Sequence, residues 1–206
     1  MMKSLLLPIV FGLVALVMST GVHAADTPDP IESVESATKD LLNKLDEVRP
    51  LYDSDKEKFF SEIESALGPF IDFDGFARGV MAKYYRLASD EQKAEFAQTF
   101  RQQLIRTYSS ALVEFKNEKI EVLPLESPPE NGRATARLEI HAEDGAVYPV
   151  TYTLALVDGN WKLRNIIVEG INIGLQFRSQ FSNYMQQYRN DIDAVIENWD
   201  VEIENS

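Results

Sequence analysis

The sequence predicts an α+β fold in which helices come first, an antiparallel β-meander follows and one more helix closes the chain. Apolar residues recur every three or four positions as far as Asn117, alternate with polar ones from Ile120 to Leu163, and return to helical spacing after Gly170. Helices followed by a run of strands are typical of α+β domains, whereas α/β domains alternate the two.

The N-terminus has the features of a cleavable signal peptide. Lys3 gives a positive start, residues 5–18 are apolar but interrupted by a proline and a glycine, and Ala24 precedes the expected cleavage point. The run is too short and too interrupted to favour an uncleaved membrane anchor. We therefore expect residues 1–24 to be removed and residues 25–206 to form one exported, soluble domain in a periplasm.

The chain is acidic and contains no cysteine. Its 20 basic and 33 acidic residues give a net charge of −13, which becomes −14 when Lys3 leaves with the signal peptide. Nucleic acid and anionic membrane surfaces repel such a chain, although solubility alone explains the charge equally well. The absence of cysteine excludes a disulfide framework and a lipid-attachment site.

Two helices are expected before residue 69. Asp29 caps the first, and its apolar stripe ends at Val48. Ser54 and Glu57 form the predicted capping box of the second helix, which Gly68 and the following proline stop.

Two more helices follow. Asp72 caps the third, whose apolar side extends to Tyr84, and Ser89 with Gln92 forms a capping box for a long fourth helix. The fourth helix carries its large apolar groups at Phe96, Phe100, Leu104, Tyr108, Leu112 and Phe115.

The strands are marked by a change of period from 3.6 to 2. Residues 120–122 form a short first strand, residues 134–140 a second with one wet face, and residues 150–156 a third. Residues 158–160, with the sequence Asp-Gly-Asn, are typical of a hairpin turn.

The fourth strand begins with one solvent-exposed face and ends with both faces apolar. Trp161 and Leu163 alternate with basic residues, whereas residues 166–168 are apolar throughout, and a turn at Gly170 leads into a helix near Ile173. A single last helix is expected to carry Phe177, Phe181, Tyr184, Tyr188, Ile192, Val195 and Trp199.

No group of residues predicts catalysis or metal binding. His141, the one histidine that remains after removal of the signal peptide, falls on the polar face of its strand with no evident partner. Asp72 and Asp74 are more typical of a helix N-terminus than of acid–base catalysis. What remains is an excess of apolar groups. These either fill one another as a core or line a pocket; the small Ala134 and Ala136 leave room for a pocket, but periodicity alone does not decide.

Three segments resemble the MlaC family of periplasmic phospholipid-binding proteins, also called the toluene-tolerance family. They are PFIDFDGFARGVMAKYYR (69–86), QKAEFAQTFRQQLIRTY (92–108) and GNWKLRNIIVEGINIGLQFRSQF (159–181), and the matching order covers residues 31–199. An acidic residue is common in the family where Asn165 stands, and a serine where Asn172 stands. Neither difference removes an apolar side chain.

The resemblance implies a nuclear-transport-factor-like cone, in which a curved antiparallel sheet of about four strands is wrapped by helices around an apolar cavity. It also implies a soluble phospholipid carrier, with lipid as cargo and no cofactor, that is not an enzyme. Such a carrier exchanges lipid with an outer-membrane lipoprotein complex and an inner-membrane ABC transporter, maintains outer-membrane lipid asymmetry, and inserts stably in neither membrane.

Within that fold we expect the acyl chains to lie between the inner face of the sheet and the two long helices, with the headgroup near Lys83, Tyr84 or Arg86. The expected lipid-binding residues are Val80, Met81, Tyr84, Phe100, Leu104, Tyr108, Val150, Tyr152, Leu154, Ile166 and Val168. Two alternatives stay open at this point: a periplasmic interaction protein or chaperone with an apolar groove, and an isomerase or dehydratase on the same cone.

Overall fold

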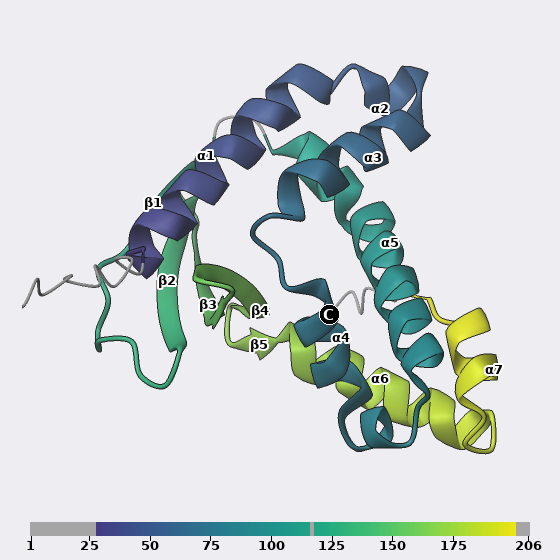
Figure 1. The fold of residues 1–206 in the computed structure, drawn as a ribbon. Coiled ribbons are helices and arrows are strands. Elements are labelled where there is room, and N and C mark those ends of the chain that lie inside the picture. Colours follow the sequence, from purple (N-terminus) through teal and green to yellow (C-terminus); the bar gives the residue numbers. More distant parts are fainter. Residues whose placement is uncertain (1–27, 116–117, 201–206) are drawn as a thin grey trace, which may run out of the picture.

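The computed structural model describes residues 28–115 and 118–200, so the expected signal peptide lies outside the described residues. Figure 1 shows the sheet and the long helix α5 on opposite sides of the molecule, joined by other helices above and below. The helices are α1 (Pro30–Val48), α2 (Leu51–Ser54), α3 (Lys56–Leu67), α4 (Phe73–Met81), the 3₁₀ helix η1 (Ala82–Arg86), α5 (Asp90–Glu114), α6 (Ile173–Gln187) and α7 (Ile192–Glu197). The strands are β1 (Lys119–Val122), β2 (Arg133–His141), β3 (Val147–Val157), β4 (Asn160–Val168) and β5 (Ile171–Asn172).

The sheet is an antiparallel meander in the order β1-β2-β3-β4-β5, which confirms the α+β prediction. It has one strand more than expected, because β5 pairs two residues with β4 after the predicted turn at Gly170. The hairpin between β3 and β4 is also confirmed. Asp158 and Gly159 have φ of 49° and 79°, which is the backbone that a tight two-residue hairpin loop requires.

A β-bulge in β4 decides which side chains share a face. Thr153 pairs with Asn165 but Leu154 pairs with Leu163, so Arg164 is one extra residue on this strand. Strict alternation would have placed Asn165 on the face that carries Leu163. The bulge instead turns Ile166 and Val168 to that face, which we call the inner face of the sheet.

The free side of β4 is occupied by two short segments. Near the start of the strand, Leu163 N–H donates to Phe70 O over 2.8 Å and Asp72 N–H donates to Leu163 O over 2.9 Å. Near the end of the strand, β5 takes the same position. The loop before α4 is therefore part of the sheet edge.

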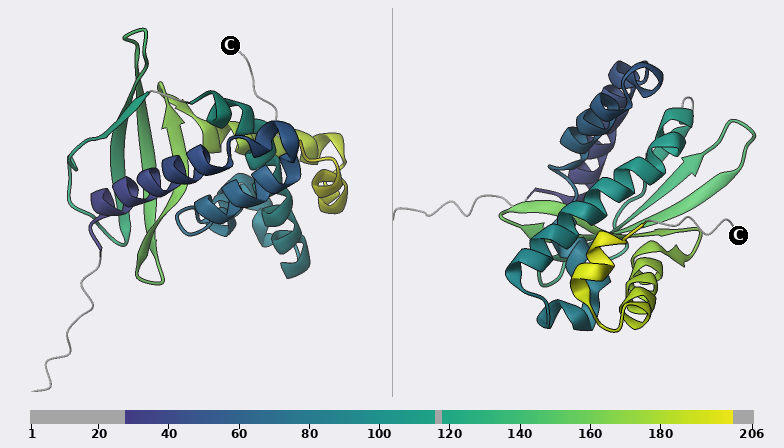
Figure 2. Two further views of the ribbon diagram at one scale, coloured as in Figure 1. Left: turned by 90° about the horizontal axis from the view of Figure 1, so that it is seen from above. Right: turned by 90° about the vertical axis from the view of Figure 1, so that its right-hand side faces the viewer.

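Helix α1 joins the sheet to the helices. Asp29 caps it as predicted, accepting from Ile31 N–H over 2.6 Å. Val34, near its start, packs with the inner face of the sheet, whereas Leu45 and Val48 near its end pack with α3 and α5. Figure 2 shows α1 lying across the strands.

The remaining helices enclose a separate cluster of aromatic side chains. Phe100 is fully buried between the rings of Phe76, Phe177 and Phe96, whose centroids lie 5.2, 5.3 and 5.9 Å from its own. Offset and edge-to-face contacts at these distances are favourable for aromatic rings. These side chains of α4, α5, α6 and α7 form an aromatic core, called the helical cluster, that is separate from the inner face of the sheet.

Two helix boundaries differ from the sequence prediction. Asp55, and not Ser54, caps α3, because its side chain accepts from Lys58 N–H while the Ser54 hydroxyl donates to a carbonyl of the preceding turn. The expected single last helix is broken at Arg189 and Asn190, whose φ of 56° and 64° lie in the left-handed region.

The third predicted helix, whose apolar side was expected to extend to Tyr84, is also interrupted. The α-helix α4 ends at Met81, and the tighter 3₁₀ helix η1 continues after Ala82, whose φ is 50°. The two capping predictions at Asp72 and at Ser89 with Gln92 are confirmed.

Candidate lipid-binding site

The inner face of the sheet is apolar along its whole length, but only one end of it is covered. At the end under α1, Leu154 and Trp161 are 0% and 4% exposed. At the other end, Tyr148 and Ile171 are 38% and 44% exposed. We call this second region the open end of the inner face; it consists of Ile140, Tyr148, Tyr152, Ile166, Val168 and Ile171.

Helix α5 faces the sheet without packing tightly on it. Its extensive contacts are with α3, α4 and α7, and none of comparable extent joins it to a strand. Leu104 and Tyr108, two of the predicted lining residues, are half-buried on this helix. Figure 1 shows α5 and the sheet on opposite sides of the molecule. Apolar groups on these two facing elements are thus left partly uncovered.

Tyr152 on the sheet and Tyr108 on α5 are partly desolvated. Burial raises the pKa of Tyr152 and of Tyr108, although each side chain keeps some accessible surface. Phe70, from the loop beside β4, packs near Tyr152 with a centroid distance of 6.3 Å.

The predicted lining residues fall into two groups in the structure. Tyr152, Ile166 and Val168 lie on the open end of the inner face. Leu154 is buried at the end under α1, and Val150 is buried between Tyr152 and Tyr148 on β3. The others belong to the helical cluster, where Leu104 and Tyr108 are half-buried and the remaining four, Val80, Met81, Tyr84 and Phe100, are buried.

Lys83 and Arg86, the cations expected near the headgroup, lie apart from the inner face of the sheet. Lys83 and Arg86 are exposed on η1, and Lys83 Nζ lies 4.9 Å from the ring centre of Tyr84. Tyr84 is itself packed against Phe181 in the helical cluster, with a centroid distance of 5.9 Å. This corner therefore belongs to the surface of the helices and not to the inner face of the sheet.

Some residues of the region were not predicted. Ile140 and Ile171 lie on the open end, and Ile140 carries the same alternation signal as the rest of its strand. Phe70 is supplied by a loop and Ile171 by a two-residue strand, where no periodicity exists to reveal them.

The joint between sheet and helices is held by polar contacts. Arg164 Nε donates to Asp72 Oδ2 over 2.5 Å, and Gly75 N–H donates to Asp72 Oδ1 over 2.9 Å at the start of α4. A Cβ on Gly75 would lie 2.2 Å from Asp72 Oδ2, so only glycine fits beneath this ion pair. On the α6 side, Gly174 N–H donates to Asn165 Oδ1 over 3.0 Å.

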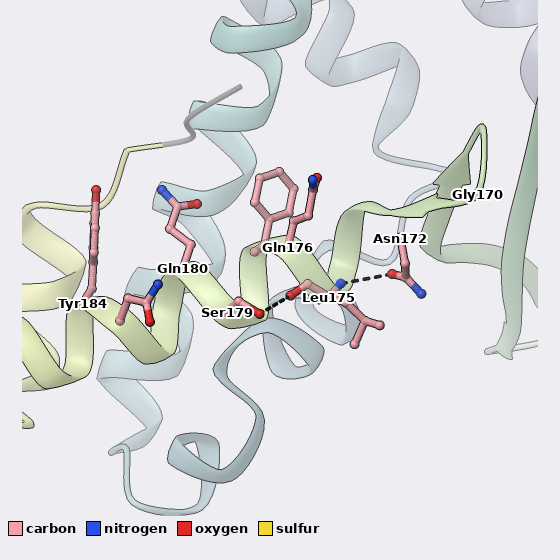
Figure 3. A pocket seen from close by; sticks show the side chains of 9 residues that line it. Gly170, Asn172, Leu175, Gln176, Ser179, Gln180 and Tyr184 are labelled. Atoms are coloured by element: carbon pink, nitrogen blue, oxygen red, sulfur yellow. Dashed lines mark hydrogen bonds between the residues drawn. The ribbon is translucent and has the colours of Figure 1, made fainter. Parts of the chain in front are cut away.

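A pocket of about 640 Å³ adjoins the open end on α6 (Figure 3). It begins at Gly170 and Asn172, on either side of Ile171, and continues along the helix to Tyr184. Asn172 also caps α6 by accepting from Leu175 N–H over 3.0 Å.

His141 differs from expectation in having acidic neighbours. Its Nε2 lies 3.4 Å from Glu139 Oε2 and 3.9 Å from Glu121 Oε2, on the face opposite the inner one. Within residues 28–115 and 118–200 no cluster of histidine and carboxylate groups is suited to hold a metal ion. No helix in the same part of the chain is both long and apolar enough to cross a bilayer.

The sequence matches a known protein family over most of its length. The family model for the MlaC protein aligns with residues 35–201. The chain belongs to the MlaC family. Its three characteristic segments meet in space, since residues 69–86 and 159–181 form the Asp72–Arg164 joint and residues 92–108 lie on α5, which packs against α4.

Individual relatives agree with this assignment to the MlaC family. The chain is 39% identical over 181 residues to the toluene tolerance protein ttg2D of Pseudomonas putida, covering 87% of this chain and 83% of that protein. It is 22% identical over 148 residues to the intermembrane phospholipid transport system binding protein MlaC of Haemophilus influenzae, covering 70% and 69%.

The fold is shared with a solved structure. The phospholipid-binding protein from Ralstonia solanacearum, determined in complex with a phospholipid, superposes with a TM-score of 0.75 at 20% identity, covering 82% of this chain and 94% of that one.

Proposed function

We propose that this member of the MlaC family is a periplasmic carrier that holds the acyl chains of a phospholipid between the open end of the inner face and α5. The observation that carries the proposal is the uncovered apolar surface on both elements. Tyr152, Ile166 and Val168 on the sheet and Leu104 and Tyr108 on α5 are half-buried, although they lie on elements that face each other. The phospholipid-bound relative with the same fold supports the choice of cargo.

The energetics explain why a carrier needs such a surface. Two acyl chains contain about thirty methylene groups, and exposing each to water costs about 0.8 kcal/mol, so roughly 25 kcal/mol opposes free transit. An apolar cavity removes most of this cost and makes exchange with a bilayer nearly neutral. The direction of lipid transport would then be set by the membrane complexes to which the carrier docks, and not by the carrier itself.

In this proposal some of the expected lipid-binding residues contact the acyl chains and the others support the walls of the site. The half-buried side chains on β3, β4 and α5 contact the acyl chains, and Val150 and Leu154 form the floor of the sheet beneath them. Val80, Met81, Tyr84 and Phe100 hold α4, η1, α5 and α6 together and so shape the wall from behind.

The same reasoning favours a carrier over an enzyme. The groups on the open end are aliphatic side chains and tyrosines, and burial raises the pKa of Tyr152, which disfavours the ionised form further. We further propose that residues 1–24 are a signal peptide that exports the chain to the periplasm. There it would exchange lipid with an outer-membrane lipoprotein complex and an inner-membrane ABC transporter and so help maintain outer-membrane lipid asymmetry.

Organic extraction of the purified protein followed by mass spectrometry tests the proposal. We expect phospholipid in stoichiometric amount. A protein that is free of lipid, takes up none from vesicles and instead binds unfolded polypeptide would refute the carrier and favour the chaperone.

A further inference from the structure

The pocket on α6 is distinguished by the chemistry of its walls. Its lining contains four side-chain amides and no charged residue, in a chain of which 26% is charged. Gln176, Gln180 and Asn183 follow one another at steps of four and three, so they share one side of α6, and Asn172 stands before them as the N-cap. In Figure 3 the side chains of Gln176, Gln180 and Tyr184 point to the same side of α6.

Two of these amides are available to a ligand. Gln176 and Asn183 are exposed, and their side chains make no hydrogen bond with any other residue in the described part of the chain. Gln180 is already engaged, since its Nε2 donates to Asp200 O over 2.6 Å. Each free amide offers both a donor and an acceptor.

The position of the pocket relates it to the acyl chains. Ile171 pairs with Val168 and therefore lies on the inner face, at its most exposed end. Gly170 and Asn172, the residues beside it, are the first wall of the pocket. The apolar inner face therefore ends at the same turn at which the amide-lined pocket of α6 begins, as a boundary between acyl chains and headgroup requires.

We propose that this pocket holds the headgroup of the carried phospholipid and recognises it through hydrogen bonds to Gln176 and Asn183, without ion pairs. The inference rests on the proposed function. Its volume of about 640 Å³ is in the range of pockets for small ligands, about 300–1,000 Å³. Amide N–H groups donate to the phosphate oxygens, and walls without carboxylates do not add to the repulsion of phosphate by an acidic chain.

A neutral pocket has a definite consequence for selectivity. Amides accept zwitterionic and anionic headgroups alike, because neither requires a countercharge from the protein. The ratio of phosphatidylglycerol to phosphatidylethanolamine taken up from mixed vesicles should therefore stay near that of the vesicles and should not change with salt.

The test uses the full protein, delipidated and equilibrated with vesicles that contain phosphatidylethanolamine, phosphatidylglycerol and diacylglycerol with the same acyl chains. The double variant Gln176→Leu/Asn183→Leu should retain at least about fivefold less of both phospholipids, because it removes two neutral hydrogen bonds and one alone contributes about that factor, and unchanged diacylglycerol. The matched control Gln186→Leu/Gln187→Leu, on exposed amides of α6 outside the pocket, should behave as wild type. Gln176→Glu, which keeps the size of the side chain, should reduce phosphatidylglycerol more than phosphatidylethanolamine.

Several results would overturn the inference. Equal losses of diacylglycerol and phospholipid, unchanged retention of phospholipid, or a salt-sensitive preference for phosphatidylglycerol would each exclude recognition by neutral amides. If wild type takes up neither phospholipid nor diacylglycerol, the proposed function fails and the inference fails with it. If wild type takes up all three lipids and the double variant loses none, only the headgroup pocket fails.

Discussion

The ion pair between Asp72 and Arg164 offers the sharpest test of how the sheet is joined to the helices. Replacing Asp72 by alanine removes the cap of α4, at about 1 kcal/mol, and a charge-assisted hydrogen bond, at about 1.5–3 kcal/mol. The lower figure applies to the second term, because the Arg164 side chain is 37% exposed and water replaces part of the lost contact. We therefore expect Asp72→Ala to lower the free energy of unfolding by about 2.5 kcal/mol.

The contributions of cap and charge can be separated. Asp72→Asn keeps the cap and should cost about 1.5 kcal/mol, whereas Asp74→Ala, on the exposed first turn of α4, should cost about 0.5 kcal/mol. Urea unfolding followed by circular dichroism measures these differences, and Asp72→Ala should lower Tm by about 8 °C in a chain of this size. If Asp72→Ala were no worse than Asp74→Ala, or if a double-mutant cycle of Asp72→Asn with Arg164→Gln showed no coupling, the reasoning would be refuted.

Three further predictions concern the lipid surface, the α6 joint and alkaline pH. Ile166→Asp should reduce bound phospholipid at least about tenfold, because a carboxylate against an acyl chain is poorly solvated, whereas Ile167→Asp on the opposite face should not; equal losses in extracted lipid would contradict the assignment of faces. Gly174→Ala should destabilise by about 1–3 kcal/mol, because its Cβ would lie 2.3 Å from a side-chain oxygen, whereas Gly79→Ala, with open space at this position of α4, should stabilise by about 0.5–1 kcal/mol in the same unfolding assay. Burial raises the pKa of Tyr152, so above about pH 10 the unfolded chain loses this proton first and stability falls as pH rises; Tyr152→Phe should reduce the slope of unfolding free energy against pH there, and an unchanged slope would show that this phenol does not titrate differently in the two states.

Local signals in the sequence predicted most of the elements. Asp29, Asp72 and Ser89 cap the helices that they were expected to cap, because a cap depends on the few residues that follow it. The helix boundaries that were predicted wrongly lie where a local signal is ambiguous or silent. Asp55 stands beside Ser54 and accepts the hydrogen bond instead, and the left-handed residues Arg189 and Asn190 interrupt an otherwise unbroken helical spacing.

The candidate site was harder to predict because it depends on contacts between distant segments. Alternation predicts that Tyr152 and Val150 share a face, and this face is the inner one. It does not predict the bulge at Arg164, which requires a partner on α4, nor the loop that brings Phe70 to the sheet. Phe100 and Leu104 show the same limit: both are apolar on one helix, and only the packing of α6 and α7 decides that Phe100 is buried.

The occupied edge of β4 bears on how such a protein avoids edge-to-edge association while an apolar face stays partly open. Sheets join edge to edge when a strand presents unpaired backbone groups, and this is the usual beginning of aggregation. Here residues 70–72 and β5 hold one side of the sheet. The opposite edge, β1, is only four residues long and carries the charged pair Lys119 and Glu121, joined over 2.8 Å. Closing the edges protects the empty carrier from polymerising, so the apolar surface is left to lipid.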